Sequence, residues 1–242
     1  MVNWEGMIMN DKIIGIIGGM GPKATIDLYT KIVDATEIEK EQDHFRVIID
    51  SNPKIPDRTE GILGIGESPL NALIETGKNL EKLGVDIGCI PCITAHYFIE
   101  DVQKELSYPI LNALEELNKY IKENYSGVKK VGVLATTGTR KIGLFQKYLT
   151  DFSIIYPSDE IQKECVMEAI YGKEGIKHGN LGNKPLQLLK RASDELIEKG
   201  AELIISGCTE IILVLKPHHI TKPLIDPMDV LAKAIVNTAK LA

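Results

Sequence analysis

The chain repeats itself at a spacing of about 116 residues, and this repeat constrains the fold more than any other feature of the sequence. KIIGIIGGMGPKATIDLYTKIV begins like KKVGVLATTGTRKIGLFQKYLT, so that Gly15 matches Gly132. Further on, NLEKLGVDIGCIPC lines up with ELIEKGAELIISGC, which sets Cys92 against Cys208. YPILNALEELNKYI and KPLIDPMDVLAKAI follow in the same order. Three ordered matches indicate a duplicated unit, whose two copies are expected to pack about a pseudo-twofold axis.

Each copy alternates short β-branched runs with helical patterns. Near-continuous apolar runs are typical of parallel strands that are covered on both faces. The helical patterns between them indicate right-handed βαβ units. The predicted fold class is therefore α/β, with two similar domains and mostly parallel sheets. The predicted strands are residues 12–18, 45–51, 85–91, 129–135, 153–157 and 201–207.

The repeat also predicts the domain boundaries. Residues 1–10 are expected to form a loose tail, 11–116 the first α/β domain and 117–223 the second. A final helix, 227–241, is expected to return and join the first domain, because its counterpart in the first copy leads across to the second.

Composition excludes several classes of protein. The 242 residues are 44% hydrophobic and carry a net charge of −6, which argues against nucleic acid as a partner. The first residues lack the basic and apolar regions of a signal peptide. No apolar run approaches the roughly 20 residues of a membrane span. The expectation is a cytoplasmic protein that contacts no membrane.

The chain has four cysteines, and two of them, Cys89 and Cys92, stand in a Cys-x-x-Cys arrangement. The repeat sets Cys89 opposite Ile205, in the middle of a predicted strand, where a cysteine acts as a small hydrophobic residue. Cys92 and Cys208 instead follow the ends of strands, where α/β sheets bind ligands. The pair expected to face one another across a cleft is therefore Cys92 with Cys208.

Two facing thiols can act as a base and an acid on opposite sides of a substrate. Helix starts after both cysteines are expected to favour the thiolate, and coupled titration leaves one thiolate and one thiol. A substrate held between them loses a proton to one face and regains it from the other, which inverts a stereocentre. The sequence has no metal-ligand cluster and no cofactor motif around the two cysteines. Fixed donors must therefore stabilise the carbanion. The loops 18–25, with Met20, and 135–139, with Thr136, offer backbone N–H groups to a small anion.

Five segments together resemble the aspartate/glutamate racemase family, and its aspartate racemase branch in particular. They are GIIGGMGPKAT, SNPKIPDRT, PCITAH, GIKHG and SGCTE, in order from about residue 12 to 232. The resemblance implies a cofactor-independent amino-acid racemase of two α/β domains, commonly a homodimer, that acts on a small acidic amino acid, most often aspartate or glutamate. It implies that Cys92 and Cys208 are catalytic and that no metal takes part. It further implies that Arg58 and Lys177 bind the substrate's side-chain carboxylate and that the pocket is lined by Asn52, Thr94 and Thr209.

One residue departs from the family pattern. Ile93 stands where the family usually has an asparagine directly after the cysteine, and isoleucine can neither donate nor accept a hydrogen bond. A contact to the substrate worth about 0.5–1.5 kcal/mol is therefore missing or supplied by another group. This departure keeps open a non-catalytic or weakly active acidic amino-acid-binding protein, or another isomerase of the same superfamily.

Two other interpretations stay open at this point. GMGPKA, at residues 19–24, also fits the G-x-G-x-x-A dinucleotide fingerprint, with Asp50 near the position of a ribose-binding acid. Cys89 and Cys92 could form a redox pair, although the motif begins inside a strand. Of the remaining residues, His96 and Cys165 are predicted to be structural. Glu210 either tunes Cys208 or complements a helix dipole.

Overall fold

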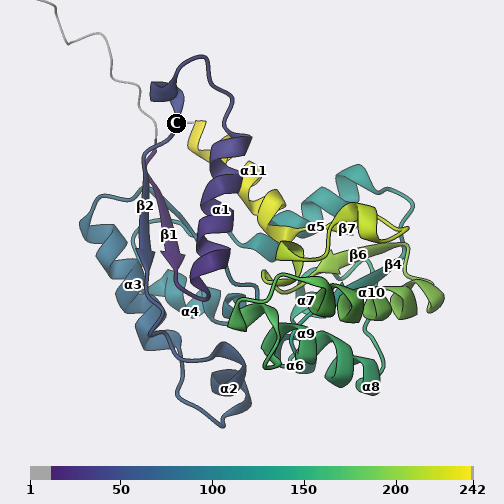
Figure 1. Cartoon of the computed structure of the whole chain (residues 1–242). Coiled ribbons are helices and arrows are strands. Elements are labelled where there is room, and N and C mark those ends of the chain that lie inside the picture. Colours follow the sequence, from purple (N-terminus) through teal and green to yellow (C-terminus); the bar gives the residue numbers. More distant parts are fainter. Residues whose placement is uncertain (1–11, 241–242) are drawn as a thin grey trace, which may run out of the picture.

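The computed structural model describes residues 12–240 and contains two parallel β-sheets with helices around them (Figure 1). One sheet has the strand order β2-β1-β3 and the other β5-β4-β6-β7. All six predicted strands are present, and the predicted fold class is confirmed; the expected tail, 1–10, lies outside the described residues. The strands are β1 (Ile14–Gly18), β2 (Val47–Ser51), β3 (Ile87–Cys89), β4 (Lys130–Leu134), β5 (Ser153–Ile155), β6 (Leu203–Ser206) and β7 (Leu224–Ile225).

The strand register follows the repeat seen in the sequence. Gly15 of β1 pairs with Gly88 of β3, and its counterpart Gly132 of β4 pairs with Ile204 of β6. Beside β6, Ile204 also pairs with β7, while Gly88 forms a single parallel bridge with Ile110 at the matching place in the first sheet. The sequence analysis did not predict β7, because a strand of two residues leaves no pattern.

Helices cover the faces of both sheets. In α1 (Pro22–Ala35), proline opens the helix, where its missing N–H costs nothing, and Ala24, Leu28 and Ile32 recur every four residues on the buried face. None of the helices within residues 12–240 is long and apolar enough to cross a membrane. The other α-helices are α2 (Arg58–Leu63), α3 (Leu70–Lys82), α4 (Ile99–Lys104), α5 (Ala113–Asn124), α6 (Thr137–Lys141), α7 (Leu144–Tyr148), α8 (Asp159–Ile161), α9 (Glu168–Tyr171), α10 (Asn183–Glu198) and α11 (Pro227–Lys240). Shorter or irregular turns are η2 (Glu41–Asp43), η3 (Thr94–Phe98), the π-helix η4 (Gln162–Met167), η5 (Ile176–His178), η6 (Ile211–Leu213) and η7 (Pro217–His219).

The last helix, α11, packs between α1 and α5, so that the chain's C-terminal helix joins its two halves (Figure 1, yellow). Its buried face belongs to one continuous apolar cluster that includes residues of β1, β3, β4 and β6. A buried ion pair of 3.1 Å between Lys31 Nζ of α1 and Asp226 Oδ2 fixes the start of α11. Asp226 also accepts a hydrogen bond from the N–H of Met228 in the first turn.

Candidate active site

A small cavity lies where loops that follow strands of the two sheets meet. Its volume is about 10 Å³, which is room for roughly one water molecule. Every site residue predicted from the sequence except Asn52 lines it. The lining consists of Met20, Asp57, Arg58, Thr59, Cys92, Ile93 and Thr94 from the first half and Thr136, Tyr171, Lys177, Cys208, Thr209 and Glu210 from the second.

Cys92 and Cys208 reach this cavity from equivalent positions. Each follows a strand that pairs in parallel with the first strand of its half, β3 beside β1 or β6 beside β4, and each precedes a short 3-10 turn, η3 or η6. Cys89, by contrast, lies inside β3, has no exposed surface, and places its Sγ 3.6 Å from the carbonyl oxygen of Gly15. Burial raises the pKa of the Cys89 thiol far above its ordinary value. The two thiols that share a cavity are therefore those of Cys92 and Cys208.

The surroundings of Cys208 favour the protonated thiol. Its Sγ–H donates to Glu210 Oε2 at 3.0 Å, and Thr209 Oγ1 donates to the same oxygen at 3.3 Å. Burial, followed by the negative charge of Glu210, raises the pKa of Cys208 well above that of a free thiol, although Lys177 opposes the shift. The expectation that helix starts favour a thiolate at both cysteines is wrong for Cys208. Only a three-residue 3-10 turn starts near it, and burial together with the adjacent carboxylate outweighs the backbone N–H groups.

Glu210 joins Cys208 to Lys177. Its other oxygen, Oε1, lies 2.9 Å from Lys177 Nζ, and this ammonium also lies 5.1 Å from the centre of the Tyr171 ring. Burial raises the pKa of Glu210, but Lys177 and the Cys208 hydrogen bond outweigh burial and leave that pKa below its ordinary value. Burial likewise lowers the pKa of Lys177, and Glu210 more than reverses the effect. Both groups are therefore charged.

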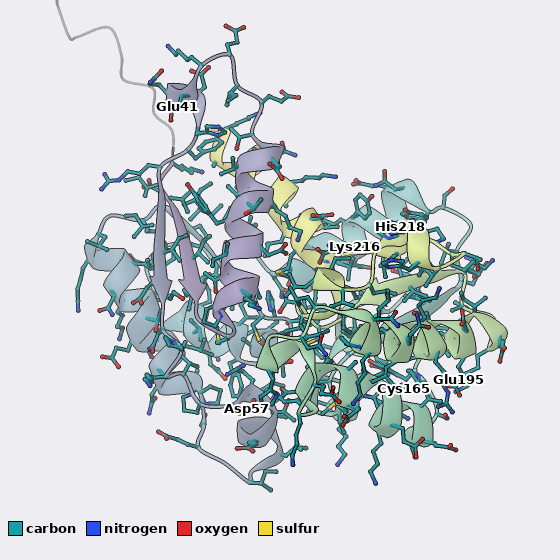
Figure 2. All side chains as sticks on the ribbon, viewed as in Figure 1. Glu41, Asp57, Cys165, Glu195, Lys216 and His218 are labelled. Carbon is teal, nitrogen blue, oxygen red and sulfur yellow. The ribbon has the colours of Figure 1, made fainter. Side chains whose placement is uncertain are left out.

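Cys92 has a cation as its neighbour instead of a carboxylate. Arg58 opens α2, and its guanidinium donates to two backbone carbonyls of the preceding loop, at 3.3 and 3.0 Å. Burial lowers the pKa of Arg58, but the proximity of Cys92 and Asp57 outweighs burial and raises it overall. Asp57, labelled in Figure 2, caps α2 by accepting a hydrogen bond from Glu60 N. Arg58 thus places a positive charge beside Cys92.

A chain of three hydroxyl groups crosses between the halves beside the cavity. Thr94 Oγ1 lies 2.9 Å from Thr139 Oγ1, which lies 3.1 Å from Thr136 Oγ1. Thr136 also caps α6 by accepting from the N–H of Thr139. Thr139 was not singled out from the sequence, although it belongs to the predicted 135–139 loop; Tyr171 was missed too, and it stands in no motif.

Asn52 takes no part in lining the cavity. Its amide nitrogen donates to Thr76 Oγ1 of α3 at 3.3 Å, and its side-chain oxygen accepts from the N–H of Lys54. Its backbone lies so close to Gly19 that a Cβ on that glycine would come within 2.3 Å of the Asn52 carbonyl carbon. The structure therefore places Asn52 in the support of the 19–24 loop rather than among the residues that line the cavity.

Two further residues, predicted from the sequence to be structural, are buried outside the cavity lining. His96 is 1% exposed; its Nδ1 lies 2.9 Å from the carbonyl oxygen of Cys92, and its Nε2 accepts from the N–H of Ala113 at 3.1 Å. Burial lowers the pKa of His96 to about 4. Cys165, labelled in Figure 2, lies in η4 and is fully buried in an apolar cluster that includes residues of β4 and β6. No group of three or more potential metal-ligating side chains occurs in residues 12–240.

Known proteins share both the sequence pattern and the fold. The sequence model of Asp/Glu/Hydantoin racemase matches residues 17–235. The broad specificity amino-acid racemase RacX of Bacillus subtilis (strain 168) is 32% identical over 230 residues, which cover 93% of this chain and 97% of that protein. The structure of Picrophilus torridus aspartate racemase covers 94% of each chain with a TM-score of 0.78 and 29% identity. An aspartate racemase homologue from Pyrococcus horikoshii OT3 covers 94% of this chain and 99% of its own, with a TM-score of 0.75 and 26% identity.

These similarities extend over nearly the whole chain and include both cysteine-bearing loops. The resemblance predicted from the sequence is confirmed, and with it the prediction of an isomerase of the amino-acid racemase type. The chain belongs to the Asp/Glu/Hydantoin racemase family.

Proposed function

We propose that this protein racemises an acidic amino acid, aspartate first, by moving the α-proton between Cys92 and Cys208 without an organic cofactor. The observation that supports this most directly is that two thiols line one cavity in opposite electrostatic surroundings. Cys92 has the cation Arg58 beside it, and Cys208 donates its proton to Glu210. One thiolate and one thiol at the same substrate carbon are the base and the acid that a two-base mechanism requires.

In the direction that starts from this state, the Cys92 thiolate takes the α-proton, and the electron pair of the broken C–H bond passes to the α-carbon and its carboxylate. Cys208 then donates its S–H proton to the opposite face of the same carbon. The product has the inverted configuration, Cys92 is a thiol and Cys208 a thiolate. Once the product has left, Lys177 pairs with Glu210 and offsets the negative charges of Cys208 and Glu210. The reverse reaction begins from there.

The charges of the cavity suit a substrate with two carboxylates. Arg58 and Lys177 are cations on its lining, and the hydroxyl groups of Thr94, Thr136 and Thr209 add donors for the α-carboxylate. The similarity to Picrophilus torridus aspartate racemase supports aspartate, and the similarity to the broad specificity racemase RacX supports testing other amino acids as well. Asn52 would act by holding the 19–24 loop, and Met20 by closing one wall.

Proton NMR in D2O tests the proposal. L-aspartate and L-glutamate are incubated separately with the protein, and the D-enantiomer is measured on a chiral column. We expect the α-proton signal of aspartate to disappear as D-aspartate forms. Cys92→Ser and Cys208→Ser should each abolish racemisation, whereas the control Cys165→Ala should retain it because Cys165 is buried away from the cavity. Full activity of either serine variant would refute the two-base mechanism.

One observation favours a second candidate, an acidic amino-acid-binding protein with little or no activity. Ile93, between Cys92 and Thr94 among the residues that line the cavity, is 1% exposed and belongs to the apolar core. A shift of the melting temperature by aspartate without exchange of its α-proton would support this candidate.

A homodimer and a cytoplasmic location stay predictions. Light scattering during gel filtration would test the first.

A further inference from the structure

A second, larger cavity adjoins the catalytic cavity. We call it the vestibule; its volume is about 570 Å³, whereas the catalytic cavity has about 10 Å³. Only the vestibule is large enough for an amino acid, since ligand sites typically have about 300–1,000 Å³. The two cavities share four lining residues, which form the wall between them: Met20, Arg58, Lys177 and Glu210.

The wall must move before a substrate can contact both cysteines, because the catalytic cavity holds no more than about one water molecule. Part of the wall is the ion pair between Lys177 and Glu210, at 2.9 Å. Lys177 lies on the 3-10 turn η5, between Gly175 and Gly179, whereas Glu210 lies between β6 and η6. The two partners of the pair thus come from different segments, and separating them would open the wall on the vestibule side.

Glu210 is paired with the ammonium group of Lys177, which the proposed function assigns to the substrate's distal carboxylate. Its carboxylate contacts Lys177 through Oε1 and Cys208 through Oε2, so it has no oxygen free of a partner. A carboxylate on an incoming amino acid would compete with Glu210 for the same cation. Arg58, the other cation of the wall, already donates to two backbone carbonyls and has Cys92 as a neighbour.

We propose that Glu210 is an internal competitor for the substrate's distal carboxylate, and that exchange of Lys177 from Glu210 to that carboxylate opens the wall between the vestibule and the cysteines. This inference rests on the proposed function, and it deepens it by naming the step that selects a second carboxylate. An amino acid without a distal carboxylate leaves Lys177 on Glu210 and the wall closed. Glu210 is thus a positioning residue that sets specificity.

The exchange has a measurable consequence for binding. A ligand's apparent dissociation constant equals its intrinsic constant divided by the fraction of protein molecules in which the partner group is free. Glu210→Gln removes the competing charge, so aspartate should bind about tenfold more tightly, a coupling within the range typical of linked sites. Turnover should fall at the same time, because Cys208 loses its carboxylate partner. Tighter binding with slower turnover is not the result expected of a residue that only supports the fold.

Isothermal titration with equilibrated DL-aspartate measures the dissociation constant without net heat from turnover. A double-mutant cycle with Lys177→Met shows whether the gain passes through Lys177. We expect Glu210→Gln to lower the dissociation constant about tenfold in the wild-type background and not at all in the Lys177→Met background. DL-asparagine should show no gain. Glu174→Gln is the matched control, because Glu174 pairs with Lys184 at the surface and its removal changes the net charge equally.

Two results would overturn the inference. One is binding of aspartate by Glu210→Gln that is no tighter than in the wild type. The other is a gain that persists with Lys177→Met, because a general field effect would then explain it. If Glu210→Gln does not fold, Glu210→Ala removes the same charge and replaces it in the cycle. Failure of the proposed function is separate, since wild-type protein would then neither exchange the α-proton of aspartate nor of glutamate.

Discussion

Acidification is expected to destabilise this protein through His96, whose ring lies 2.9 Å from the carbonyl oxygen of Cys92. The neutral ring satisfies two buried backbone groups at once: Nδ1–H donates to the carbonyl of Cys92, and Nε2 accepts from the N–H of Ala113. A second proton would take the acceptor from Ala113 and bury a charge. Folding therefore lowers the pKa of His96 from its ordinary value near 6.5 to about 4, with burial as the main cause.

The sign follows from proton binding. Below pH 6.5 the unfolded chain binds a proton at His96, whereas the folded chain binds it only near pH 4. The free energy of unfolding therefore falls as pH falls through this window. At pH 5 the loss relative to neutral pH is about 2 kcal/mol, and it approaches about 3 kcal/mol below pH 4. At pH 8 the ring is neutral in both states and the effect disappears.

Urea unfolding followed by circular dichroism at pH 8 and pH 5 measures this contribution. His96→Gln should be less stable than the wild type at pH 8, because Gln cannot satisfy both backbone groups, yet it should lose about 2 kcal/mol less on acidification. His218→Gln, at an exposed position in η7, is the control and should keep the wild-type dependence on pH. Equal losses in His96→Gln and the wild type would refute the reasoning.

Three other substitutions test the structure. Gly19→Ala should lower the melting temperature far more than Gly64→Ala. Both glycines have positive φ, at 97° and 69°, but only at Gly19 would a Cβ meet backbone, 2.3 Å from Asn52. Equal effects on the melting temperature would contradict that crowding. Ile93→Asn should lower the free energy of unfolding by about 2 kcal/mol, because it buries an amide. It should also tighten aspartate binding in calorimetry by adding a donor to the cavity, and weaker binding would argue against that role. Lys31→Met leaves Asp226 buried without its cation and should cost about 3 kcal/mol in urea unfolding, while a change below 1 kcal/mol would show that the pair contributes little.

Most of the fold could be predicted because the chain carries the same pattern twice. The pairing of Gly15 with Gly88 and of Gly132 with Ile204 reproduces the spacing of the repeat in three dimensions. Sequence patterns failed where an element is very short. β7 has two residues, and in the first sheet its place is taken by one bridge at Ile110, so neither leaves a periodic signal.

The site was harder to predict because its charges depend on contacts between distant segments. The positions of Cys92 and Cys208 followed from the repeat. The partners did not: the proximity of Arg58 to Cys92 joins the 55–58 loop to the end of β3, and no periodicity encodes that distance. Glu210 was noticed only as a neighbour in sequence, and its simultaneous contacts with Cys208 and Lys177 needed the structure. Asn52 looked like a pocket residue from its motif, but its amide is engaged with Thr76.

The duplication has one more consequence. Thr94 and Glu210 stand at equivalent places, two residues after Cys92 and Cys208, so the two copies of the repeat differ in charge at this position. An enzyme that interconverts mirror images needs a similar group on each side of its substrate, whereas the transfer of a single proton needs one basic and one acidic side. Duplication can supply the first, and divergence between the copies, as at Thr94 and Glu210, can contribute to the second. A pair of chains related by strict twofold symmetry could not separate these demands, because every change would appear on both walls.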